Sequence, residues 1–129
     1  MWEGWPIARV ILLFLAVVFI AIFVQVTMFH YRQNFRHWAQ WLPVLGAPLL
    51  GLVSLLLVFY VTPLLILSAG IFYAVGALAG LTGLTLHTTG VGERVGGYNL
   101  ENFLVGPPVI LPMMVLSMSV LGLIALYWR

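Results

Sequence analysis

The sequence predicts an all-α integral membrane protein, a bundle of four transmembrane helices joined by short loops. Hydrophobic residues make up 64% of the 129 residues, and only eight residues are charged. A soluble domain is nearer half apolar, and one of this size cannot hide so much apolar surface from water. The charged residues also lie outside the long apolar runs. Since a spanning helix needs about 20 apolar residues, four of them occupy most of the chain.

The first span is predicted over residues 6–29. Pro6 suits a first helical turn, where the missing N–H is not needed. Trp2 and Trp5 come just before it, where aromatic residues gather at membrane surfaces. The run 10–24 is entirely apolar. This segment therefore enters the membrane near its tryptophans.

The segment 30–41 is the first polar loop and contains neither glycine nor proline. It is therefore expected to be helical, either by extending the first span or as an interfacial helix. Trp38 and Trp41 are expected at the headgroup level. Gln25, about one turn before His30, is expected to bond to that histidine or across helices.

The next 45 residues, 42–86, are almost continuously apolar. A single helix of that length would rise roughly 67 Å, about twice the thickness of the hydrocarbon layer. The chain is predicted to turn back at Thr62, because a following proline disfavours helical geometry. This gives spans 42–59 and 63–86, packed as an antiparallel hairpin.

The second polar loop, 87–106, holds four glycines between residues 90 and 97 and is predicted to be rich in turns. It lacks the spacing of a phosphate-binding loop. Pro107 and Pro108 are predicted to begin the fourth span, 107–128, which Pro112 is expected to kink.

Four spans place both polar loops on one face of the membrane, and both termini and the Thr62 turn on the other. The loop face has three arginines and the terminal face has two, which favours cytoplasmic loops under the positive-inside rule. The ionisable residues brought together on the loop face are His30, His37, His87, Glu93, Glu101, Arg32, Arg36 and Arg94.

Three histidines on one face allow two interpretations. Each alone is typical of an amphipathic residue at the interface. Together they could hold a b-type haem, which needs two imidazoles from different helices, and His87 paired with His30 or His37 would supply them. The least favoured alternative is a mononuclear metal site that combines the histidines with a carboxylate, from His30, His37, His87 and Glu93 or Glu101. The spacing of these residues matches no metal-site signature, so no metal ligands are predicted.

The third span carries a glycine stripe, Gly76, Gly80 and Gly83, at helical intervals that end in His87. The favoured interpretation is close helix packing through small residues. The alternative is a groove in which a flat cofactor or a quinone ring lies against the backbone beside His87.

Several classes of protein function are disfavoured because the sequence lacks the residues that they need. There is no lysine, aspartate or cysteine, so thiolate metal sites and a Ser/His/Asp triad are excluded, and hydrolase chemistry is not expected. A net charge of +2 is too small for nucleic-acid binding. The spans contain no charge at mid-depth, where proton-coupled transporters and pumps keep one.

The sequence is therefore consistent with three functions. The first is a small noncatalytic subunit that assembles, anchors or supports a larger membrane complex. The second is an electron-transfer subunit that binds haem b or a quinone, and the third is a small channel or transporter. Lipid and other membrane subunits are the expected partners, and the sequence leaves open whether the chain forms a homo-oligomer.

Overall fold

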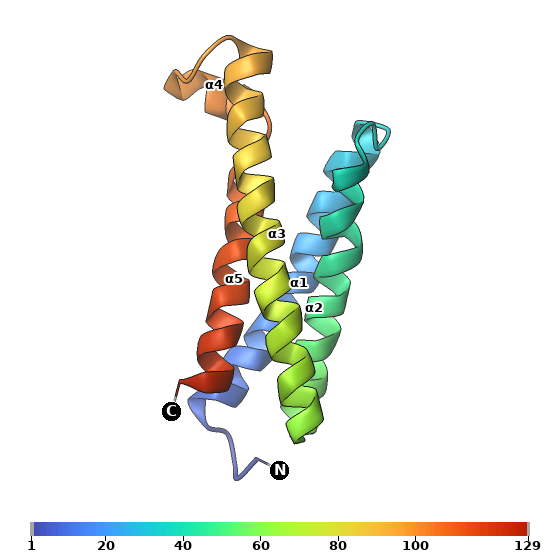
Figure 1. The fold of residues 1–129 in the computed structure, drawn as a ribbon, viewed down its shortest axis with the longest axis vertical. Coiled ribbons are helices and arrows are strands. Elements are labelled where there is room, and N and C mark those ends of the chain that lie inside the picture. Colours follow the sequence, from blue (N-terminus) through green and yellow to red (C-terminus); the bar gives the residue numbers. More distant parts are fainter. Residues whose placement is uncertain (1, 129) are drawn as a thin grey trace.

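A computed structural model describes residues 2–128 (Figure 1). Within that range, four helices are long and apolar enough to cross a membrane, with α2 extended at its start by the short helix η1. The predicted all-α four-helix class is confirmed, and the chain is an integral multi-pass membrane protein. The helices in chain order are α1 (Ile7–Arg32), η1 (Trp38–Gln40), α2 (Trp41–Phe59), α3 (Pro63–Val95), α4 (Leu100–Val105) and α5 (Ile110–Tyr127).

The four long helices form two pairs, α1 with α2 and α3 with α5. Both termini lie at one end of the bundle together with the α2–α3 turn, as Figure 1 shows. The α1–α2 connection and α4 lie at the opposite end. This arrangement agrees with the even number of crossings predicted from the sequence.

The tight turn falls where the sequence places it. Thr62 is the N-cap of α3 and its hydroxyl accepts a hydrogen bond from the Leu65 N–H at 3.2 Å, with Pro63 in the first helical position. The α2 and α3 helices contact each other on the side of this turn, where Ser54 meets Tyr73, and Figure 1 shows them diverging towards the other end. The predicted hairpin is therefore closely packed only over the half that lies near Thr62.

The first loop is less helical than predicted. The α1 helix continues past residue 29 to Arg32, and a turn with Asn34 and Phe35 at positive φ then leads into η1. The Phe35 ring stacks on Trp41, with centroids 4.1 Å apart. An interfacial helix is thus reduced to the single 3₁₀ turn Trp38–Gln40 that opens α2.

The end of the third span departs most from the prediction. The α3 helix does not stop at residue 86 but continues to Val95, so Gly90 and Gly92 are helical rather than turn residues. A side chain at Gly90 would lie 3.1 Å from Pro107, and one at Gly92 would meet the Tyr98 ring. These glycines therefore let the returning chain pack against bare helix backbone.

The turn itself begins at Gly96, whose φ of +92° is left-handed and favours glycine. The short helix α4 follows, and the fourth span then begins at Ile110 instead of residue 107. Pro107 and Pro108 lie in the connection, while Pro112 is in the first turns of α5 and packs against Gly83.

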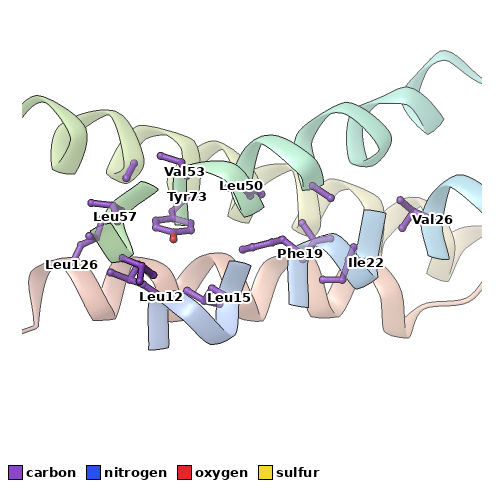
Figure 2. Packing of buried hydrophobic residues seen from close by; sticks show 14 of the residues in the cluster. Leu12, Leu15, Phe19, Ile22, Val26, Leu50, Val53, Leu57, Tyr73 and Leu126 are labelled. Carbon is purple, nitrogen blue, oxygen red and sulfur yellow. The ribbon is translucent and has the colours of Figure 1, made fainter. Parts of the chain in front are cut away.

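The core runs along the centre of the bundle and is drawn from all four long helices (Figure 2). Tyr73 is its largest fully buried side chain. The Tyr73 hydroxyl lies 2.6 Å from Ser54 Oγ on α2, and its ring stacks with Phe19 on α1 at 6.5 Å. One side chain of α3 thus joins the two helix pairs.

The terminal end is closed by polar contacts to the last turn of α2. The indole of Trp2 donates to the Leu57 carbonyl at 2.7 Å, and Arg9 Nε donates to the Val58 carbonyl at 3.0 Å. The Arg9 guanidinium also lies over the Trp5 ring, 4.1 Å from its centre. A positive charge at a helix C-terminus is favourable, which explains an arginine this close to the membrane.

Candidate functional site

His87 lies within α3 instead of ending it. Its Nδ1 is 2.8 Å from the Pro108 carbonyl oxygen, so the imidazole donates a proton there. That bond fixes the tautomer in which Nε2 carries a lone pair. Histidines that ligate metals are held by the same kind of backbone bond. His87 is therefore oriented by the loop before α5 and keeps a free ligand atom.

His30, near the end of α1, is the most buried of the three histidines, with 7% of its surface exposed. Its Nδ1 is buried and has no hydrogen-bond partner among residues 2–128. The neighbouring ring is that of Phe35, 6.3 Å away. Gln25 does not supply the missing bond, because its side chain is exposed on another face of α1. A buried polar atom left unpaired is costly and calls for a partner.

His37 has a different role from the other two. Its Nδ1 accepts a hydrogen bond from the Ala39 N–H at 3.2 Å, and its backbone N–H donates to the Gln40 side chain. These contacts cap η1. His37 is exposed, so the bond is that of an N-cap residue. Among the described residues no group of three or more potential metal ligands lies together.

The glycine stripe faces α5. A Cβ at Gly80 would lie 2.5 Å from the Leu116 nitrogen, and one at Gly83 would lie 3.1 Å from Pro112. At Gly76 it would meet Ser119 at 2.6 Å and Leu50 at 2.9 Å. The stripe thus forms the seam along which α3 and α5 approach most closely, and a cofactor lying on it would have to displace α5.

A feature that the sequence pattern did not predict lies at the far end of α3. A 33-residue helix rises roughly 50 Å, whereas the hydrocarbon layer is about 30 Å thick. In Figure 1 the end of α3 and α4 lie beyond the start of α5 and beyond the α1–α2 connection. The end of α3 and α4 therefore project beyond the ends of the other three long helices.

This projection carries exposed apolar side chains, which we call the α4 patch: Leu100, Leu104 and Val105, with 79%, 81% and 75% of their surface exposed. Leu100 and Leu104 are one turn apart and so lie on one side of α4. The α4 helix is not among the four helices that are long and apolar enough to cross a membrane, and no described residue covers these three side chains. One sequence feature could have predicted this helix. Asn99, a residue type that often caps helix N-termini, is followed by the largely apolar run Leu100–Val105.

The surroundings of the α4 patch are acidic. The segment 88–106 carries Glu93 and Glu101 against a single arginine, Arg94, and all three side chains are exposed. The first loop, in contrast, carries Arg32 and Arg36 and no acid. The two loops on this face thus present charges of opposite sign.

The chain matches no family model, and comparisons with curated proteins and with solved structures find no similar protein.

Proposed function

We propose that this protein is a small noncatalytic membrane subunit that assembles or anchors a larger membrane complex, and that the α4 patch is its docking surface. The observation that carries the proposal is exposed apolar surface on α4, a short helix that is not one of the four candidate membrane spans. Contiguous apolar side chains outside lipid mark interaction sites, and they are costly to leave in water. A polar rim, here Glu93, Arg94 and Glu101, is the usual border of such an interface.

The charge of this segment favours a protein partner over a lipid surface. Helices that lie on membranes are rich in lysine and arginine, which attract anionic headgroups. The α4 sequence, LENFLV, contains a glutamate and no basic residue. Anionic lipid would therefore repel the α4 surface, whereas a protein with a basic rim would complement it.

The test is the particle mass of the chain extracted from its native membranes in mild detergent. We expect the wild-type chain to migrate in a particle larger than a dimer of itself. Replacing both Leu100 and Leu104 by alanine should reduce the fraction in that particle at least tenfold, because buried anchors of an interface each contribute roughly 1–2 kcal/mol. The matched control replaces Leu64 and Leu67, which are exposed on α3 within the membrane.

The control variant should keep the wild-type particle. The proposal is contradicted if the wild-type chain migrates only as a monomer or dimer, or if both double variants behave alike. Strong quenching of a fluorophore at residue 104 by spin-labelled lipid would also contradict it, since α4 would then rest on the membrane.

A second candidate function, electron transfer through a bound haem b or quinone, is supported by the histidines on α1 and α3. His87 is held as a ligand histidine would be, and the buried Nδ1 of His30 has no hydrogen-bond partner in the described part of the chain. Haem would supply one-electron redox chemistry, and the protein would supply the two imidazoles. The glycine seam does not support this candidate, because α5 occupies it.

The absorption spectrum of the protein purified from its own membranes tests this second candidate. A haem held by His30 and His87 should give a Soret band that His87→Ala abolishes and His37→Ala leaves unchanged, since His37 caps η1. A colourless protein, or a band that survives His87→Ala, rules out the proposed haem ligation.

A further inference from the structure

We infer that a second copy of this chain docks on α1 within the membrane, with Gln25 of each copy bonded to the other. Gln25 lies on the outer surface of α1 in a stripe at helical intervals of three and four residues. All members of this stripe are exposed; they are Phe14, Val17, Ala21, Gln25 and Met28. We call this the α1 stripe.

The observation behind the inference is a polar side chain that the fold leaves facing lipid. Arg9 and Thr27, also on α1, each bond to a backbone carbonyl. The Gln25 side chain makes no hydrogen bond to any residue in the range 2–128 and is exposed. Apolar residues, Val24 and Val26, flank it on both sides. In hydrocarbon an amide gains a partner only from another protein or by reaching towards the headgroups.

The partner of Gln25 must carry a hydrogen-bonding group at the same depth in the membrane, and a second copy of this chain does so. Two copies inserted in the same orientation hold Gln25 at the same depth, and a two-fold axis along the membrane normal brings their α1 helices together. An amide both donates and accepts hydrogen bonds, so two glutamines satisfy each other. Ala21, one turn before Gln25, lets the helices approach closely at that level. A different partner would need a polar group at this depth by coincidence.

Because the chain contains no cysteine, single cysteines report the interface directly. Ala21→Cys should form a disulfide-linked dimer on oxidation in liposomes, since a bridge requires Cα atoms within about 7 Å. Leu78→Cys, exposed on α3, is the matched lipid-facing control and should form several-fold less. Adding Gln25→Leu to Ala21→Cys should lower the dimer fraction about three- to tenfold, the value of one interhelical hydrogen bond.

Gln25→Leu replaces an exposed side chain, so the unfolding midpoint of this variant should match that of the parent. A matching midpoint shows that the lower dimer fraction does not come from loss of the fold. The inference is overturned if Gln25→Leu leaves cross-linking unchanged, which would mean that the amide reaches the headgroups. It is also overturned if Leu78→Cys cross-links as well as Ala21→Cys, or if Ala21→Cys links only to another protein. None of these three outcomes bears on the α4 patch, which lies on a different helix.

Discussion

Replacing Tyr73 by alanine is expected to lower the free energy of unfolding by about 3 kcal/mol, near the lower end of the range for truncating a buried aromatic residue. Tyr73 is fully buried where α1, α2, α3 and α5 meet. Its ring stacks on Phe19 and covers Gly122, where a Cβ would lie 2.6 Å from it. Lipid is as apolar as the core, so the loss comes from the void and its missing contacts, not from transfer to water.

Tyr73→Phe separates the ring from its hydroxyl. This variant keeps the packing and removes only the bond to Ser54, so it should cost about 0.6–1.7 kcal/mol. Ser54 keeps its bond to the Leu50 carbonyl at 2.6 Å and is not left unpaired. Unfolding in mixed detergent, followed by tryptophan fluorescence, gives both values. Equal losses for phenylalanine and alanine would contradict the packing argument.

Gly80→Ala is expected to destabilise the fold by about 2–3 kcal/mol, the upper part of the range for overpacking. The added methyl would lie 2.5 Å from the Leu116 nitrogen and 2.8 Å from its Cα. Both are backbone atoms, so no rotamer change relieves the clash, and α3 must move away from α5.

Gly46→Ala is the control for this prediction. Gly46 lies in α2, and nothing would be within 4 Å of its added Cβ. Alanine there should be neutral or stabilising by up to about 1 kcal/mol, because glycine is a poor helix residue. The same unfolding titration compares the two variants. If both shift stability equally, the seam between α3 and α5 is not closely packed.

Apolar run length was enough to predict the spans and the Thr62 turn, because the bilayer sets the length of each span and proline limits the turn. Apolar run length did not predict that residues 87–95 continue the α3 helix. Gly90 and Gly92 look like turn residues in the sequence, yet Pro107 and Tyr98 pack against them and keep that segment helical. Contacts with residues distant in sequence decide whether these glycines are helical. The order of residue types along the chain does not show those contacts.

At the candidate site, too, the sequence predicted part of the arrangement and only the structure shows the rest. The even number of spans predicted that His30 and His87 belong to one end of the bundle. The pattern did not reveal that the Pro108 carbonyl holds His87, that η1 needs His37 as its cap, or that α5 fills the glycine stripe. These roles depend on residues distant in sequence or on the local backbone path.

The four-span topology and the proposed docking surface both require that the two polar loops, including the α4 region, face the same aqueous compartment. Single cysteines at Glu3, Arg36 and Asn99, all exposed positions of a cysteine-free chain, test this with a membrane-impermeant maleimide on sealed oriented vesicles. We expect Arg36→Cys and Asn99→Cys to be labelled from one side and Glu3→Cys from the other. Labelling of Arg36→Cys and Asn99→Cys from opposite sides would contradict the four-span topology and the docking surface derived from it.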